Sequence, residues 1–359
     1  EAETLLNSIE EEKSLETIID VAYLYMDMGY PEKALPWLTL GLEEYKENEE
    51  FLAAMADCYR SGERNTKAIS FYNKLIDKNS YWTGLAKCHF SQQEFDKAVE
   101  ACDFALAADD KFGEAHIIRA HSLFHLENET EAIQEYQLAL QSKSLPPDFA
   151  HMFIGLAYAN QEKWELAYRS YEQAMKIIGD DNSPILSDIY SNEIFCLSKL
   201  GRYEEAHQLC EKAKKQLPES VEIYLQEGRL YLEEDKFEEA KQCWAVALQY
   251  APEAETLVQI GNYSLDYGMV ENARLCFEEA KKQDPDYPGI NGRLASICMI
   301  LRDHKGFQKY NQMSETPLNI EMIQEMLSQN TDKDILQNLE TFMNELDDVN
   351  DGETEEENN

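Results

Sequence analysis

The sequence predicts an all-α fold, a right-handed superhelical solenoid of antiparallel helix pairs, and two regularities in the chain carry this prediction. Alanine recurs at nearly constant spacing, with successive gaps of 34, 30, 34, 35, 39, 34 and 33 residues. Five of these alanines are followed four residues later by an aromatic residue. A period near 34 residues is typical of helix-turn-helix solenoids. The alanines of the series are Ala34, Ala68, Ala98, Ala132, Ala167, Ala206, Ala240 and Ala273.

Each repeat is expected to hold a first and a second helix, and the alanine marks the second. Residues four and seven positions after the alanine lie on the same face of that helix. Ala or Gly stands twelve positions before the alanine in every repeat except the one with Ile194, and such small residues let two helices approach closely. Proline follows the alanine by twelve residues at Pro218, Pro252 and Pro285, where the second helix should end.

These residues resemble the tetratricopeptide repeat family, whose pattern of small, alanine, aromatic and proline positions they share. The best single match is the segment from Gly228 to Pro252. The resemblance covers roughly Leu15 to Pro317, with eight clear repeats and a degenerate ninth in which Phe307 stands where alanine is expected. Because the motif is structural, the resemblance implies the fold and a partner-binding surface rather than one particular role.

The two ends of the chain lack the repeat pattern. Residues 1–14 are expected to form half a repeat, because their apolar residues have the spacing of a second helix. Residues 318–347 carry two amphipathic segments, and we expect capping helices there, since the terminal units of a solenoid must cover an exposed apolar face. Residues 348–359 are acidic with one apolar side chain, which predicts a disordered tail.

Two gaps depart from the period. The 39-residue gap before Ala206 predicts a longer turn around residues 179–184. The 30-residue gap before Ala98 is short, and we predict that about four residues are missing from the chain between Asn79 and Ser80. The alternative is a genuine deletion, which would distort the packing of the helices on either side.

The charge of the chain limits its partners. Its 70 acidic and 32 basic residues give a formal net charge of −38, which argues against nucleic acid and anionic membranes as partners. Two interpretations stay open: the charge keeps a long solenoid soluble, or it attracts a basic partner. No run of apolar residues is long enough for a transmembrane helix.

Motifs for catalysis and metal binding are missing from the sequence. It has no Gly-rich phosphate loop and no nucleophile elbow, so we predict no enzyme activity and no cofactor. His121 and His125 have the spacing of two metal ligands but no fixed third ligand, and we predict no metal site. The eight cysteines form no Cys-x-x-Cys pair, which predicts buried, reduced thiols and a cytoplasmic protein. The chain begins at Glu1 rather than at methionine, so an upstream targeting segment is an open alternative.

In the tetratricopeptide repeat family the first helix of each repeat lines the concave face. The resemblance implies that the residues three before, one after and four after each small residue face this groove. The chaperone-binding members use a clamp of lysine, arginine and asparagine, which this chain does not match at Ile19 and Tyr23. The predicted groove residues are Tyr23, Met26, Arg60, Lys87, Phe90, Ile117, His121, Phe124, Met152, Leu156, Phe195, Leu225, Arg229, Leu232 and Asn262.

This lining is apolar apart from a few charges, among them Arg60, Lys87 and Arg229. An exposed apolar strip usually marks an interaction site, although the same residues could pack on one another in a tightly wound solenoid. We therefore predict a non-enzymatic scaffold or adaptor that binds a protein or peptide, either basic or carrying apolar anchors, in its groove. The alternatives are a peptide-sensing regulator and the repeat portion of a larger enzyme. The sequence makes no prediction of oligomeric state.

Overall fold

The computed structural model describes residues 14–75, 81–179 and 183–318, and eighteen α-helices and one short 3-10 helix are the regular elements in these ranges, with no strand. The predicted all-α fold is therefore confirmed. The chain divides into two compact units, residues 1–196 and 197–359.

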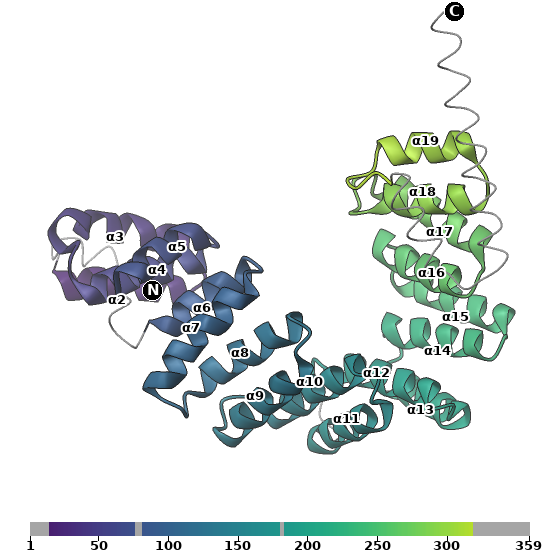
Figure 1. Cartoon of the computed structure of the whole chain (residues 1–359), viewed down its shortest axis with the longest axis horizontal. Coiled ribbons are helices and arrows are strands. Elements are labelled where there is room, and N and C mark those ends of the chain that lie inside the picture. The colour runs from purple at the N-terminus through teal and green to yellow at the C-terminus, as the bar shows by residue number, and fades with distance from the viewer. Residues whose placement is uncertain (1–13, 76–80, 180–182, 319–359) are drawn as a thin grey trace, which may run out of the picture. The chain divides into compact units, whose positions relative to one another are not determined.

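The first unit holds five complete helix pairs, which follow one another in chain order (Figure 1). Its helices are α2 (Leu15–Asp27), α3 (Pro31–Tyr45), α4 (Glu49–Ser61), α5 (Asn65–Tyr72), α6 (Trp82–Ser91), α7 (Phe95–Ala108), α8 (Gly113–His125), α9 (Glu129–Gln141), α10 (Pro147–Asn160) and α11 (Trp164–Ile178), followed by most of α12 (Leu186–Lys199). The unit boundary falls inside α12.

The second unit continues with α13 packed on α14, and then with three complete pairs. The last pair is the degenerate ninth repeat, which forms two ordinary helices around Ala295 and Phe307, both buried. The helices of this unit are α13 (Tyr203–Gln216), α14 (Val221–Glu233), α15 (Phe237–Tyr250), α16 (Ala254–Asp266), α17 (Val270–Gln283), α18 (Ile290–Ile300) and α19 (His304–Gln312).

Each pair is joined by a turn of three residues, and the turns share one hydrogen-bond pattern. Between α4 and α5 the backbone N–H of Arg64 donates to the carbonyl of Tyr59, five residues earlier, at 2.8 Å. This is the bond of a Schellman motif, which satisfies a carbonyl that the helix end leaves free. The middle residue of each turn has a positive φ, yet only three of the nine are glycine. The nine residues are Gly29, Glu63, Gln93, Glu127, Glu162, Gly201, Asp235, Gly268 and Arg302.

The core is built from contacts between the small positions and the aromatic rings of the repeat. All eight repeat alanines have 0% exposure, as their spacing predicts. A Cβ added at Gly155 would lie 2.6 Å from the ring of Tyr171, and one added at Gly228 would lie 2.2 Å from Trp244. Real Cβ atoms do not approach other atoms so closely, so these two repeats need glycine where others carry alanine.

The second repeat is the irregular one. Helix α5 has only eight residues and continues as a 3-10 helix over Asn73–Leu75, whereas the other second helices of the first unit have 13 to 15 residues. The predicted break between Asn79 and Ser80 lies outside the described residues, and so do most of the predicted terminal half-repeat, the capping helices except residue 318, the acidic tail and the centre of the longer turn.

The cysteines agree in large part with the prediction. All eight are free thiols, and six are buried, whereas Cys243 and Cys276 are only half-buried. Burial raises the pKa of the Cys58 thiol to about 11, so this side chain is neutral and poorly reactive at neutral pH. Within the ranges that the structure describes, no helix combines the length and the apolar character that a membrane crossing requires.

Candidate protein-binding groove

The first helices of successive repeats contact one another directly, α2 with α4, α4 with α6 and α6 with α8 in the first unit. Twelve of the fifteen predicted groove residues lie on such helices with part of the side chain exposed. Tyr23 is the most exposed at 37%, and the rings of Phe90, Phe124 and Phe195 are half-buried. The three phenylalanines therefore belong to the surface as well as to the inter-repeat packing.

The prediction is wrong for three of the fifteen residues. Met152, Leu225 and Leu232 have only 7%, 2% and 1% exposure, so a partner cannot contact them. Leu225 and Leu232 lie in a core cluster with Trp244. In this cluster they pack with Trp244 of α15 and Ile260 of α16, so this part of the helix face belongs to the core rather than to the groove. Met152 occupies the same repeat position as Leu225.

A cavity of about 230 Å³ opens on three consecutive first helices, α4, α6 and α8. Four of its six lining residues are predicted groove residues, so the structure brings together side chains up to 61 positions apart in the sequence. The pattern of three positions per helix missed Ser91 and Ile118, which stand at intermediate positions of the same helices. The cavity is lined by Arg60, Lys87, Phe90, Ser91, Ile118 and His121.

Asp57 organises the polar groups at one end of this cavity. Its carboxylate accepts hydrogen bonds from the hydroxyls of Tyr23 at 3.0 Å and Tyr72 at 2.5 Å, and it pairs with the Arg60 guanidinium at 3.3 Å. Burial, together with the charge of Asp57, raises the pKa of both tyrosines, so both remain hydroxyl donors. Arg60 is therefore held by an acid of its own helix before any partner arrives.

Lys87 and His121 line the same cavity from α6 and α8. The Lys87 ammonium lies 2.6 Å from the carboxylate of Glu114 in the next repeat, and both side chains remain partly exposed. Burial, with a contribution from His125, lowers the pKa of His121 to about 4, so this ring is neutral at physiological pH. Its Nδ1 atom is 2.8 Å from the hydroxyl of Tyr136.

Aromatic rings extend the cavity towards the fifth repeat. The ring of His121 packs edge-on against Phe153 at 4.7 Å between centroids, and His125 stacks on Phe95 at 4.5 Å. Phe90 lies 5.6 Å from the His125 ring. Both histidines are thus packed among aromatic rings. Among the residues that the structure describes, no three His, Cys, Asp or Glu side chains are grouped in a way that could hold a metal ion.

In the second unit, polar side chains link the first helices of neighbouring repeats. The Arg229 guanidinium lies over the ring of Tyr263 at 5.6 Å, and Arg293 donates through Nε to the Asn262 side chain at 3.3 Å. Lys199 pairs with Glu233 in the next repeat at 2.8 Å. Arg229 and Asn262, the two predicted polar groove residues of this unit, therefore already interact with side chains of the neighbouring first helix.

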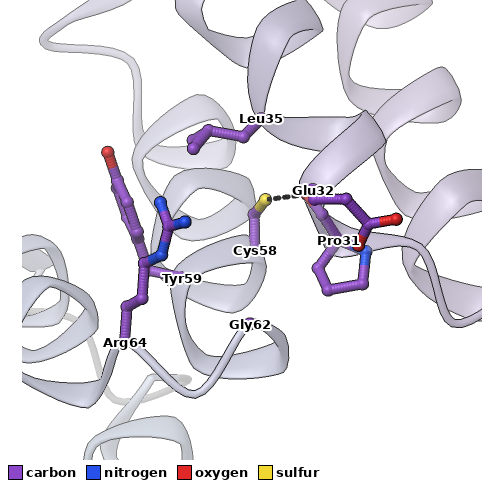
Figure 2. A pocket seen from close by; sticks show the side chains of 7 residues that line it. All are labelled: Pro31, Glu32, Leu35, Cys58, Tyr59, Gly62 and Arg64. Atoms are coloured by element: carbon purple, nitrogen blue, oxygen red, sulfur yellow. Dashed lines mark hydrogen bonds between the residues drawn. The ribbon is translucent and has the colours of Figure 1, made fainter.

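A second cavity, of about 140 Å³, lies at the turn edge of the first two repeats rather than among the predicted groove residues. Figure 2 shows Cys58 facing Pro31 across it, and the thiol donates to the Pro31 carbonyl at 3.4 Å. Glu32 and Arg64 carry opposite charges on its walls. Its lining consists of Pro31, Glu32, Leu35, Cys58, Tyr59, Gly62 and Arg64.

Comparison with known families decides the identity of the repeat. Three models described as tetratricopeptide repeat match residues 83–148, 150–185 and 197–259 in tandem. The chain is a tetratricopeptide repeat protein. A tetratricopeptide repeat protein from Parabacteroides merdae ATCC 43184 has the same fold, with a TM-score of 0.52 and 15% identity over 78% of this chain and 96% of that one. The predicted family is thus confirmed.

Two sequence relatives are also repeat proteins or assembly subunits. Anaphase-promoting complex subunit 7 of Dictyostelium discoideum is 22% identical over 250 residues, which span 67% of this chain but only 41% of that subunit. TPR repeat-containing protein YpiA of Bacillus subtilis (strain 168) is 23% identical over 84% of this chain and 82% of its own length. These likenesses support a non-catalytic tetratricopeptide repeat scaffold for protein–protein interaction.

Proposed function

We propose that this protein is a scaffold that holds an extended segment of a partner protein against the first helices of its repeats. The observation that carries the proposal is the cavity on α4, α6 and α8, because three consecutive repeats contribute side chains to one space. A partner segment that lies across these helices would contact several repeats at once. Binding would come from the burial of apolar side chains, with polar groups fixing the orientation.

The apolar part of this groove is suited to a large side chain as an anchor. Phe90 and Phe124 are half-buried, so each has a packed base and a free surface that a partner can cover. Aromatic rings held in this way lose little conformational freedom on binding, which is why they dominate interface energies. Leu156 extends the apolar surface into the fifth repeat.

The negative charges around the groove favour a partner segment that carries basic residues beside its apolar anchor. The turns that follow α4, α8 and α10 each present an exposed glutamate, Glu63, Glu127 and Glu162. These turns belong to the second, fourth and fifth repeats, whereas the turn of the third repeat holds Gln93, so the acids lie at the turn ends of three of these four first helices. Opposite charges steer association and are weakened by salt, so we expect the on-rate to fall as ionic strength rises.

The test starts from a random peptide library displayed on phage and selected against the full chain. The selected peptides are labelled, and their affinity is measured by fluorescence polarisation for the wild type and for Phe90→Ser and Phe124→Ser. Each change removes an apolar contact, and we expect the affinity to fall at least about tenfold. Leu40→Ser is the matched control, because Leu40 is 57% exposed on a second helix, away from the groove.

Urea denaturation of each variant separates loss of binding from loss of fold. If Leu40→Ser weakens binding as much as the groove variants do, the partner lies on the second helices and the proposal fails. The proposal also fails if peptides selected on the wild type bind Phe90→Ser and Phe124→Ser equally well.

A further inference from the structure

The cavity on α4, α6 and α8 gathers two cationic side chains within a strongly acidic protein. Arg60 and Lys87 reach it from two successive repeats, and His121 reaches it from the third. The whole chain carries a formal net charge of −38. Asp57 and Glu114 balance the two cations, so the cavity has no net positive charge and is distinguished by the charged donor groups that it gathers. Such donors favour a ligand group that is anionic and rich in acceptor oxygens.

The donor groups at the cavity are only partly used inside the protein. The Arg60 guanidinium donates through Nε to Tyr72 at 3.4 Å and through Nη2 to Asp57 at 3.3 Å, while Nη1 makes no hydrogen bond among the described residues. The Lys87 ammonium has three N–H groups and uses one of them towards Glu114. When the Tyr136 hydroxyl donates to Nδ1 of the neutral His121 ring, the ring proton is on Nε2, a further donor.

The existing ion pairs leave the cations accessible. The side chains of Arg60 and Asp57 have 31% and 29% exposure, and those of Lys87 and Glu114 have 37% and 46%. Ion pairs exposed to this degree contribute little to stability, so an incoming anion can share the cation at small cost. Asp57 and Glu114 hold the two cations in place before the ligand binds.

The number of donors fits a phosphoryl group better than a carboxylate. A phosphomonoester presents three acceptor oxygens and a charge of about −1.5 to −2 at neutral pH, against two oxygens and one charge for a carboxylate. Arg60, Lys87 and His121 bring donor groups to the lining from three successive repeats. The ring of Phe90 and the side chain of Ile118 add apolar walls, which suit the carbon stem of the phosphorylated residue.

We propose that this cavity binds a phosphorylated side chain of the partner segment, with Arg60 and Lys87 contacting the phosphate oxygens and Phe90 and Ile118 contacting the stem. This inference rests on the proposed scaffold function and names the chemistry that one of its subsites recognises. The glutamates of the turns and the donor groups of the cavity then select the same kind of segment, one with basic residues around a phosphorylated residue.

The probe for this proposal is phenyl phosphate, which combines the dianion with an aromatic stem. It is titrated into the full chain at low ionic strength while the ring signals of His121 are followed by NMR. We expect saturable shifts with a dissociation constant on the order of 1 mM, and much weaker binding of phenol and of benzoate. Equal binding of phenol would make the cavity a purely apolar site, and equal binding of benzoate would make it a carboxylate site; either result overturns the proposal.

Two variants test the role of the cations. Lys87→Gln should weaken phenyl phosphate about tenfold, because it removes a charge-assisted donor. Lys97→Gln removes one charge from an exposed side chain of α7 that pairs with Glu94 outside the cavity, and should leave the affinity unchanged. Equal effects of the two variants would show a general charge effect and would overturn the proposal. Thermal melting verifies that both variants fold.

The outcome is separable from that of the scaffold proposal. If selected peptides bind the groove but phenyl phosphate causes no shift of His121, this inference fails and the scaffold proposal stands. If phenyl phosphate binds and no peptide does, the scaffold proposal fails while the phosphate site stands.

Discussion

The substitution Tyr171→Phe is expected to stabilise the first unit, although it removes a side-chain hydroxyl. In two other repeats the tyrosine at the equivalent position uses its hydroxyl in a hydrogen bond. Tyr171 has 0% exposure, and its hydroxyl has no hydrogen-bond partner among the described residues. At the same position of their repeats, the hydroxyls of Tyr72 and Tyr136 reach Asp57 and His121.

The difference comes from the first helix of each repeat. Asp57 and His121 stand one position after the small residue, where the fifth repeat has Leu156, a side chain that cannot accept a hydrogen bond. A buried polar group without a partner costs about 1–3 kcal/mol, because its hydration is lost and nothing replaces it. Removal of the Tyr171 hydroxyl should therefore raise the free energy of unfolding by about 1 kcal/mol.

The equivalent changes in the other repeats should have the opposite sign. Tyr136→Phe removes one hydrogen bond and should cost about 1 kcal/mol, and Tyr72→Phe should cost about 1.5–3 kcal/mol because its partner Asp57 is charged. Long repeat arrays do not always unfold in one step, so the local measurement is amide hydrogen exchange of α10 and α11, supported by urea denaturation of the whole chain.

The reasoning is refuted if Tyr171→Phe speeds exchange in α10 and α11 as Tyr136→Phe does in its own repeat. A destabilised Tyr171→Phe would mean that the hydroxyl makes a favourable hydrogen bond, for instance to a buried water. A change of sign between two chemically identical substitutions is a sharper result than either value alone.

Three further predictions concern the turns, the core and the thiols. Glu162→Gly should stabilise the protein by about 1 kcal/mol in urea denaturation, because the residue has a φ of 56°. Glu165→Gly in the first turn of α11 should destabilise it by a similar amount, because it adds backbone freedom to the helix and removes the ion pair with Arg169. Gly228→Ala should destabilise by about 1–3 kcal/mol, because the added Cβ meets Trp244, and wild-type stability for this variant would contradict the packing. The Cys58 thiol has a pKa of about 11 against an ordinary 9, so at pH 8 it should react with a thiol reagent about a hundredfold more slowly than a free thiol. The stability of the protein should fall as the pH rises from 9 to 11, because the thiol of the unfolded chain ionises first.

The helix pairs were predictable because one residue type at one spacing fixes them. A buried alanine such as Ala240 leaves space for the neighbouring helix, and any larger residue there would force the pair apart. The residue that takes the left-handed conformation in each turn was less predictable. Glycine marks the left-handed position at Gly29, but Glu63 and Glu127 take the same conformation, because the Schellman bonds outweigh the steric cost.

The groove was predictable only in part, since exposure there depends on the neighbouring repeat. Met152 and Leu225 follow the same rule as Ile117, yet they are buried and Ile117 is half-exposed. This exposure depends on the distance between the first helices of neighbouring repeats, which cannot be predicted from the sequence pattern of a single repeat. The meeting of Lys87 and His121 at one cavity likewise depends on how closely three helices pack, which a pattern within one helix cannot express.

The position one after the small residue links the groove to the core beneath it. Asp57 faces the groove, but it is held from below by Tyr72, and His121 is held by Tyr136 in the same way. A polar groove residue at this position is thus fixed in orientation before a partner binds, which reduces the entropy cost of binding. The same link means that a change of groove chemistry at this position leaves a buried tyrosine hydroxyl without its partner. Tyr171 beneath Leu156 is that situation in the native protein, and it follows that recognition and stability are coupled at this position in the repeats whose second helix places a tyrosine beneath it.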